Sequence, residues 1–161
     1  NIVSFIFLVI LILVSFELYG TPPASELFFV ILICIFSDIG GYIIGKLLGG
    51  KKLTQISPNK TISGSIGSFI FSLFPLIILW LYFNLTDDWN LVSNDYLKLI
   101  TICLFLSLIC QLGDLFISYF KRKAKVNDTG SILPGHGGLL DRVDGVIFVI
   151  PVSYLIYKIF F

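Results

Sequence analysis

The 161-residue chain has few charged side chains, a single histidine and no methionine. Only 13% of its residues are charged, whereas 57% are hydrophobic and the mean hydropathy is +0.98. A water-soluble domain of this size could not cover so much apolar surface with so little polar material, which predicts that lipid is the main solvent. The net charge of +1 gives no basic surface of the kind that nucleic acids require. The sequence therefore predicts a membrane protein and argues against nucleic acid as a partner.

The absent methionine and the start at Asn1, directly inside an apolar run, are typical of a piece of a longer protein. A cleaved signal peptide is the alternative, but residues 1–19 already have the length of a membrane span and end without a small-residue cleavage site. We expect residues 1–161 to form a single polytopic membrane domain, with further N-terminal helices missing from this sequence.

Cysteine is scarce as well. Cys34, Cys103 and Cys110 all fall inside apolar segments, and none forms a C-x-x-C pair. This pattern predicts small buried side chains and does not support a zinc site or a disulfide.

Five stretches are long and apolar enough to cross a bilayer, which takes about 20 residues of helix. We predict membrane-spanning helices at residues 1–19, 26–46, 65–84, 97–120 and 143–161. Pro22 and Pro23 separate the first two, and Pro75 is expected to kink the third, which membrane helices tolerate. The expected fold class is an all-α integral membrane protein with about five transmembrane helices.

Two of the loops between these segments are strongly basic. Residues 46–64 and 121–142 contain nine of the eleven Lys and Arg, whereas the loop at 85–96 carries three aspartates. Because basic loops stay on the cytoplasmic side, we expect two basic cytoplasmic loops and an acidic loop that faces outward. Basic loops are also ordinary topology signals, so their charge alone does not indicate a function.

Two aspartates lie inside otherwise apolar segments. An aspartate at the centre of a membrane helix costs about 2.5–3.5 kcal/mol on insertion scales, so such residues are usually paired, cavity-facing or functional. Asp38 precedes Lys46 by eight residues and Asp114 precedes Lys121 by seven. Each is therefore expected roughly 10–12 Å below the cytoplasmic end of its helix. A structural ion pair with a neighbouring Lys or Arg is the alternative to a functional role.

The segment after Asp114 combines glycines, acids, bases and the only histidine. The residues with this chemistry are Ser118, Lys121, Arg122, Asp128, Gly135, His136, Gly137, Gly138, Asp141, Arg142 and Asp144. The glycines let the backbone approach a ligand and direct N–H groups at phosphate oxygens. Asp141 and Asp144 are three residues apart at the mouth of the last helix, so they share one face. Carboxylates mixed with Lys and Arg suit a magnesium-bound polyphosphate, with acids on the metal and bases on the phosphates.

The first basic loop has similar content. Just before a helix predicted to start near Ser63, it supplies the side chains of Ser57, Asn59, Lys60 and Thr61. A helix start offers free N–H groups to an anion. Glycines at 40, 41 and 45 narrow one face of the preceding helix, and two interpretations of this stripe stay open: close helix packing and a functional role.

These residues resemble the signature of the phosphatidate cytidylyltransferase family, the CDP-diacylglycerol synthases. From Ser118 to Asp144 the match runs Ser-x-x-Lys-Arg, a spacer, Asp, then Pro-Gly-His-Gly-Gly-x-x-Asp-Arg-x-Asp. Residues 38–45 and 57–61 are similar to a second conserved block of that family. The resemblance covers residues 38–145, and family members usually have several more N-terminal helices.

The resemblance implies transfer of CMP from CTP to phosphatidic acid, which gives CDP-diacylglycerol and pyrophosphate. It also implies Mg²⁺ as a cofactor, with a second cation as a further option. It implies metal ligation by Asp114 and Asp141, with Asp144 and Asp38 as further candidates, and includes Lys121 in the catalytic set with Asp114, Asp141 and Asp144. The implied substrate-binding residues are Ser57, Asn59, Lys60, Thr61, Ser118, Arg122, Asp128, Gly135, His136, Gly137, Gly138 and Arg142. Arg142 either holds phosphate or orients a carboxylate, and His136 either touches phosphate or braces the glycine loop.

The expected partners are CTP and the phosphatidic acid of the bilayer, with a homodimer as one candidate assembly. The expected location is the inner membrane, with the site facing the cytoplasm. Two departures from the family pattern bear on the site. Asn127 stands where the family usually has Lys before the spacer Asp, with Lys125 as a substitute, and Ser63 stands where the family usually has Glu.

Three other classes of protein are alternatives. A CDP-alcohol phosphatidyltransferase shares Asp141-x-x-Asp144-Gly145, but its Ala-Arg pair and later aspartates are absent and only 16 residues follow Gly145. A CTP-dependent kinase or cytidylyltransferase that acts on another lipid is the main alternative. An ion-coupled transporter needs acids along a path through the membrane, whereas the membrane acids other than Glu17 cluster at the cytoplasmic end.

Overall fold

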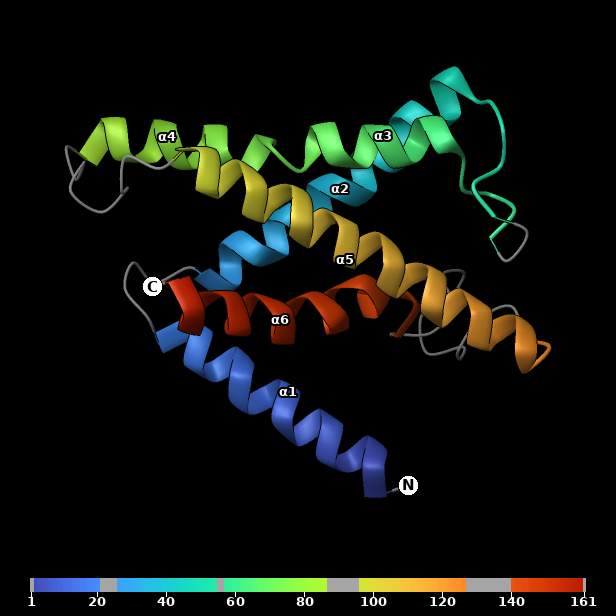
Figure 1. Ribbon diagram of the computed structural model, residues 1–161, viewed down its shortest axis with the longest axis horizontal. Helices are drawn as coiled ribbons and strands as arrows, with labels where there is room; N and C mark the ends of the chain where they lie inside the picture. Colours follow the sequence, from blue (N-terminus) through green and yellow to red (C-terminus); the bar gives the residue numbers. More distant parts are fainter. Residues whose placement is uncertain (1, 21–25, 55–56, 87–95, 127–139, 161) are drawn as a thin grey trace. The chain divides into compact units, whose positions relative to one another are not determined.

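The computed structural model describes residues 2–20, 26–54, 57–86, 96–126 and 140–160, and most of this part of the chain is helical (Figure 1). The helices are α1 (Ile2–Gly20), α2 (Glu26–Leu48), α3 (Ile62–Phe71), α4 (Phe74–Thr86), α5 (Tyr96–Lys123) and α6 (Leu140–Phe160). Within the described ranges the structure has no β-strand, only an isolated antiparallel bridge between Lys52 and Thr61. The prediction of an all-α fold is confirmed.

Three described stretches are long and apolar enough to cross a membrane, namely Glu26–Leu48, Ile62–Leu81 and Tyr96–Lys123. A shorter apolar helix covers Ile6–Tyr19. Large apolar side chains are highly exposed along these helices, for example Phe16 at 77% and Leu97 at 78%. In water such exposure would be costly, whereas lipid-facing helices present these side chains to hydrocarbon. The chain is therefore a multi-pass membrane protein, and the number of five spans stays a prediction.

The third predicted span is interrupted just before Pro75. Pro75 has no N–H group to donate to the carbonyl oxygen of Phe71, so regular α-helical hydrogen bonding stops there. The chain instead makes tighter steps, in which the Leu73 N–H donates to the Ile70 oxygen over 3.3 Å and the Leu76 N–H to the Leu73 oxygen over 3.1 Å. The predicted kink is confirmed, and it separates α3 from α4.

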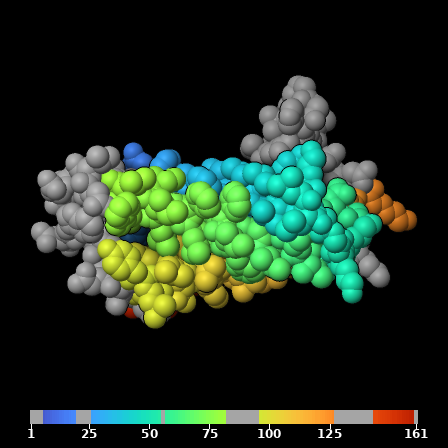
Figure 2. Space-filling view, turned by 90° about the horizontal axis from the view of Figure 1, so that it is seen from above, coloured from blue at the N-terminus to red at the C-terminus, as the bar shows by residue number. Residues whose placement is uncertain are grey.

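The described chain divides into two compact units, one made of Asn1–Ile31 and Ile109–Phe161 and the other of Leu32–Leu108. We call these unit 1 and unit 2. In unit 2, α3 and α4 form a continuous face beside the first turns of α5 (Figure 2). The rings of Phe36 and Phe74 stack with centroids 5.8 Å apart, which packs α2 against the start of α4.

Glycines bring α2 and α3 of unit 2 into close contact. A Cβ atom on Gly67 would lie 2.5 Å from the Cβ of Ile44 and 2.7 Å from the carbonyl oxygen of Gly40. A Cβ on Gly41 would lie 2.6 Å from the Oγ of Ser68. Only hydrogen fits in such gaps, so the small residues let the two backbones approach, as in other membrane helix pairs. Close packing is therefore the confirmed role of the glycine stripe.

A buried hydrogen bond links α2 to α5 in unit 2. The Oγ atoms of Ser37 and Ser107 are 2.9 Å apart, and both side chains are fully buried. Because hydrocarbon offers no alternative partner to a hydroxyl group, this bond fixes the two helices at one relative depth.

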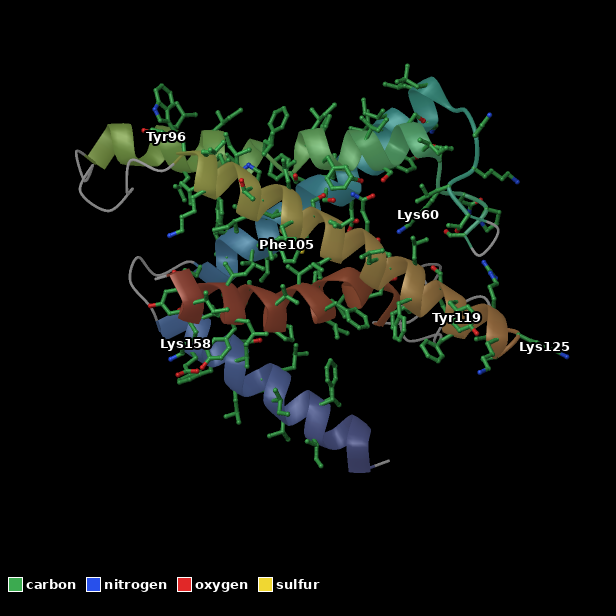
Figure 3. All side chains as sticks on the ribbon, viewed as in Figure 1. Lys60, Tyr96, Phe105, Tyr119, Lys125 and Lys158 are labelled. Atoms are coloured by element: carbon green, nitrogen blue, oxygen red, sulfur yellow. The ribbon has the colours of Figure 1, made fainter. Side chains whose placement is uncertain are left out.

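In unit 1, α1 packs against α6. Leu18 of α1 is almost completely buried, and the Lys158 Nζ of α6 lies 3.9 Å from the Glu17 Oε1 of α1. The same ammonium lies over the ring of Tyr154, 5.5 Å from its centroid. Lys158 is labelled near the end of α6 in Figure 3. This polar contact explains why Glu17 is tolerated at the end of an apolar helix.

The structure confirms the predicted burial of the cysteines. Cys34, Cys103 and Cys110 are free thiols, and their side chains are exposed by no more than 1%. They pack as small apolar groups.

Candidate active site

The candidate site begins where α5 and α6 come close together in unit 1. A Cβ on Gly113 would lie 2.8 Å from a ring carbon of Phe148 and 3.3 Å from the Cα of Gly145. A Cβ on Gly145 would lie 2.6 Å from the Sγ of Cys110 and 2.7 Å from the Oδ1 of Asp114. The absence of side chains at Gly113 and Gly145 therefore allows the backbone of α6 to reach the acidic turn of α5.

This close approach brings two carboxyl groups together. The carboxyl groups of Asp114 and Asp144 lie close enough to act electrostatically on each other. Asp144 is partly buried, and its Oδ1 also accepts a hydrogen bond of 3.0 Å from the N–H of Gly145. Two carboxylates in contact repel unless a proton or a cation lies between them. The arrangement is thus a place where positive charge is stabilised.

Lys121 supplies positive charge close to this pair. It lies seven residues after Asp114, on the same face of α5, and its ammonium acts electrostatically on Asp144. Ser118 lies between them on that face, and its side chain is partly buried. Arg122 is exposed on the last turn of α5. The end of α5 therefore presents a carboxylate, a hydroxyl and an ammonium in succession.

Aromatic rings flank the acidic pair on the same two helices. Phe116 of α5 meets Phe148 of α6 edge-on, with centroids 5.4 Å apart. Phe120 continues the contact from Phe116 at 4.8 Å and meets Tyr119 at 5.6 Å. Figure 3 shows Tyr119 on the last turns of α5, before Lys125. The contact between Phe116 and Phe148 therefore joins α5 to α6 near the acidic pair.

The donor set fits a hard divalent cation in part. Mg²⁺ prefers carboxylate oxygens and usually keeps several waters, so two adjacent carboxylates suit it. Within the described residues no group of three His, Cys, Asp or Glu side chains comes together. Asp141 lies on the first turn of α6, three residues before Asp144, but its side chain lies outside the described residues.

The first basic loop forms an ordered hairpin in unit 2. The Lys60 N–H donates to the Ser57 carbonyl oxygen over 3.1 Å, which closes a turn with Pro58 at its second position. The Thr54 Oγ1 accepts a hydrogen bond of 3.2 Å from the Ser57 N–H. Figure 3 labels Lys60 near this turn. Ser57 and Lys60 are partly buried and Asn59 is exposed, so this turn presents the predicted phosphate-binding side chains together.

The start of α3 differs from its predicted use as a free anion site. Thr61 is the N-cap of α3, and its Oγ1 accepts a hydrogen bond of 3.0 Å from the Gly64 N–H. The Ile62 N–H donates to the Lys51 carbonyl oxygen over 3.0 Å. Two of the amide groups that we expected to be available for an anion are thus used within the protein.

Ser63 has a structural role at the start of α3. Its hydroxyl donates to the carbonyl oxygen of Gly49, just after α2, and lies 3.0 Å from the Thr61 Oγ1. The serine therefore ties the end of α2 to the start of α3, a bond that needs a short hydroxyl side chain.

The remaining predicted site residues lie elsewhere or outside the described part of the chain. Asp38 is exposed on α2 in unit 2. The predictions that lie outside the described residues concern Asp128, Gly135, His136, Gly137, Gly138 and the side chains of Asp141 and Arg142. For these, the assigned roles stay predictions.

Sequence reasoning did not assign a role to Gly113, Gly145 or Ser107. Gly113 and Gly145 are each next to an aspartate, and a small residue beside a buried acid is the signal that indicates a close helix crossing at that depth. The sequence around Ser107 has no unusual feature, so its hydrogen bond with Ser37 could not be predicted from local sequence.

The helices and the site together define a multi-pass membrane protein with paired carboxyl groups between two of its helices. The sequence model of the cytidylyltransferase family matches residues 1–160. The chain belongs to this family.

Curated relatives give the same result. The phosphatidate cytidylyltransferase of Bacillus subtilis (strain 168) is 42% identical over 137 residues, which is 84% of this chain and 48% of the relative. The phosphatidate cytidylyltransferases of Staphylococcus haemolyticus (strain JCSC1435) and Staphylococcus aureus (strain COL) are each 48% identical over 122 residues, which is 74% of this chain and 44% of the relative. The chain spans about half the length of these relatives.

Proposed function

We propose that the protein transfers CMP from CTP to phosphatidic acid, releasing pyrophosphate and forming CDP-diacylglycerol. The observation that carries this proposal is the contact between Asp114 and Asp144, with Lys121 acting on the same carboxyl group. Family membership supports the nucleotide, and the names of the relatives support the lipid. The acidic pair lies on two membrane helices near their ends, where the head group of a lipid substrate resides.

In the proposed reaction, a phosphate oxygen of phosphatidic acid attacks the α-phosphorus of CTP. The new bond joins the lipid phosphate to CMP, and the bond to the β-phosphate breaks so that pyrophosphate leaves. Both reactants are anions, so the site must lower their repulsion and stabilise charge on the leaving group. No covalent intermediate with the protein is required.

The carboxylates and bases of the site divide this work. Asp114 and Asp144 would hold Mg²⁺, with Asp141 and Asp38 as further ligands, and a second cation is part of the proposal. A metal held by these carboxylates would supply positive charge to the phosphate oxygens. Lys121 would hold a phosphate group directly, because it lies close enough to act on Asp144.

The remaining phosphate contacts are proposed from the motif. Arg122, Lys60 and Arg142 would bind phosphate oxygens, and the glycine loop with His136 would direct backbone N–H groups at them. The turn at residues 57–60 supports this role for Lys60, since it holds the lysine next to the hydroxyl of Ser57 and the amide of Asn59. The other proposed binding residues are Thr61, Ser118, Asp128, Gly135, Gly137 and Gly138.

The site is proposed to face the cytoplasm from the inner membrane. The nine basic residues of the two loops at 46–64 and 121–142 support this orientation, because such loops are retained on the cytoplasmic side. CTP is a cytoplasmic nucleotide, so the same orientation gives it access. A homodimer is a further proposal, tested by the mass of the purified protein in detergent.

The decisive assay uses the full-length protein in detergent with phosphatidic acid, Mg²⁺ and CTP labelled either at its α-phosphate or at its γ-phosphate. Transfer of CMP predicts that the α-label enters the lipid and the γ-label leaves with pyrophosphate. Asp114→Asn and Asp141→Asn are expected to abolish incorporation, whereas Lys98→Gln, at the opposite end of α5, is the matched control.

The opposite labelling result would replace the proposal. Incorporation of the γ-label into a lipid alcohol would identify a CTP-dependent lipid kinase, the alternative in the sequence analysis. Full activity of both aspartate variants would remove the metal assignment while leaving the reaction intact.

A further inference from the structure

An ordered hairpin carries the lysines of the first basic loop. Gly49 and Gly50 turn the chain sharply after α2 with φ angles of +59° and +107°, which favour glycine. The Leu53 N–H donates to the Lys60 carbonyl oxygen over 2.8 Å, and the Ile62 N–H donates to the Lys51 carbonyl oxygen. The chain around Lys51 is thus held against the start of α3. We call residues 46–54 together with 57–62 the lysine hairpin.

The exposed surface of the lysine hairpin is cationic. Lys46, Lys51 and Lys52 are all exposed, and residues 46–64 contain no Asp or Glu to neutralise them. A topology signal needs only the charge of these residues. It does not require that the lysines be fixed by backbone hydrogen bonds.

Large apolar side chains lie among the lysines. Leu47 and Leu48 are 75% and 72% exposed at the end of α2, and Ile62 is 45% exposed where the hairpin meets α3. Exposed leucine side chains between lysines on one segment are unfavourable in water but suit the boundary between head groups and acyl chains. There the leucines enter the hydrocarbon and the ammonium groups meet phosphates.

Tyr42 lies one turn before Lys46 on α2 and also indicates that this segment lies at the membrane interface. Its side chain is 68% exposed, and its hydroxyl accepts a hydrogen bond of 3.3 Å from the Lys46 Nζ. The same ammonium lies over the Tyr42 ring, 5.5 Å from its centroid. Tyrosine gathers at membrane interfaces, and lysine extends its stem along apolar surface so that its charge reaches the head groups. Tyr42 and Lys46 therefore mark the interface.

We propose that the lysine hairpin lies in the head-group layer and binds anionic phospholipids of the bilayer through Lys46, Lys51 and Lys52. Within the lysine hairpin, Lys60 is assigned to the proposed active site, whereas Lys46, Lys51 and Lys52 are not. The lipids that these three lysines bind are therefore distinct from the reacting molecule. The surface enriches anionic lipid around the protein, so it acts before and independently of any nucleotide chemistry. The proposal rests on exposure, charge and apolar neighbours of one unit.

The test places a fluorescent reporter in the lysine hairpin. Trp80→Phe and Trp89→Phe remove the tryptophans of residues 1–161, any tryptophan elsewhere in the full-length protein is replaced in the same way, and Leu48→Trp introduces one beside the lysines. The full-length protein is reconstituted without CTP in phosphatidylcholine bilayers that contain either brominated phosphatidylglycerol or brominated phosphatidylcholine as the quencher. The relative association constant of the anionic lipid is expected to exceed that of the neutral lipid, and Lys51→Gln with Lys52→Gln should lower it at least about fivefold.

Two matched variants define the outcomes. Lys123→Gln with Lys125→Gln removes the same charge from the other basic loop and should leave the association constant unchanged, whereas Lys51→Arg with Lys52→Arg keeps the charge and should retain the preference. Equal quenching by both lipids, or equal losses in both glutamine pairs, overturns the proposal. Displacement of the lipid by inorganic phosphate would identify a free-phosphate site instead. Because no CTP is present, failure here is distinct from failure of the proposed reaction.

Discussion

Gly145 of α6 lies so close to Cys110 of α5 that a methyl group on the glycine would stand 2.6 Å from the cysteine Sγ. The same methyl group would stand 2.7 Å from the Oδ1 of Asp114. The spacing of the two helices and the position of the acidic pair therefore depend on one absent side chain.

Gly145→Ala is expected to lower both stability and activity. Overpacking of this kind costs about 1–3 kcal/mol, and a displacement of α6 by about 1 Å would reduce CMP transfer roughly 100-fold. Thermal unfolding in detergent and the labelled-CTP assay measure the two effects. Leu155→Ala, at an exposed position of the same helix, is the control.

Adding Cys110→Ala to Gly145→Ala should recover part of the stability but little of the activity. The second substitution removes the contact with Sγ, whereas the contact with the Asp114 carboxylate remains. Wild-type activity of Gly145→Ala alone would show that the α5–α6 spacing is not important.

Asp144→Asn should change the response of the protein to divalent cations. Without metal, loss of one negative charge relieves repulsion with Asp114 and should raise the free energy of unfolding by on the order of 1 kcal/mol. With Mg²⁺, the wild type should gain more stability than the variant, because a more tightly bound ligand stabilises the folded state more. Thermal unfolding with a chelator measures the stability change from the relieved repulsion, and thermal unfolding with Mg²⁺ measures the stabilisation by the metal.

Direct binding of Mn²⁺ gives a second measurement of the same substitution. Electron paramagnetic resonance of free Mn²⁺ should show weaker binding to Asp144→Asn and to Asp114→Asn than to the wild type. Equal Mn²⁺ binding in all three proteins would exclude these carboxylates as ligands.

Loss of the bond between Ser37 and Ser107 should destabilise unit 2. Ser37→Ala leaves a buried hydroxyl on Ser107 with one contact fewer, which is expected to cost about 1 kcal/mol. A double-mutant cycle with Ser107→Ala should give a coupling of about 0.6 kcal/mol, as for other hydrogen bonds between membrane helices. Ser153→Ala is the control, since its hydroxyl bonds only the Ile150 carbonyl of its own helix. If the stability losses of the two single substitutions simply add in the double variant, the bond contributes no net stability.

Gly67→Ala should separate α2 from α3. The added methyl group would lie 2.5 Å from the Cβ of Ile44, and the backbone oxygen of Gly40 prevents it from turning aside. We expect a loss of about 1–3 kcal/mol. Ile66→Ala, at the exposed neighbouring position, should be close to neutral, and an equal loss in both variants would contradict the packing explanation.

The helices themselves could be predicted well from the sequence. The predicted spans 26–46 and 97–120 correspond to Glu26–Leu48 and Tyr96–Lys123, because long apolar runs in this composition have no other stable conformation in lipid. The predicted span at 65–84 corresponds to the apolar stretch Ile62–Leu81, which the structure divides into α3 and α4. Pro75 was recognised as a kink, but the carbonyl that it leaves without a donor ends α3 altogether.

The candidate site was predictable in its residue types and less so in its pairing. The motif gave Asp114, Asp141 and Asp144 together, but only three-dimensional packing at Gly113 and Gly145 shows that Asp144 contacts Asp114. Two of the amides expected to be free at the start of α3 are used within the protein, because Thr61 caps that helix and Lys51 accepts from Ile62. Local spacing cannot show whether a hydroxyl serves a ligand or the backbone beside it.

The burial of Cys34, Cys103 and Cys110 has a practical consequence for labelling studies. Their thiols are closed to reagents that act from the aqueous phase, so residues 1–161 should give little background with a membrane-impermeant maleimide. A single cysteine introduced at Lys125 or Lys158 would then report which side of the bilayer each helix end occupies, without prior removal of the native residues. Because these three thiols fill gaps between helices, the surface of residues 1–161 has no native thiol that would interfere with mapping the orientation.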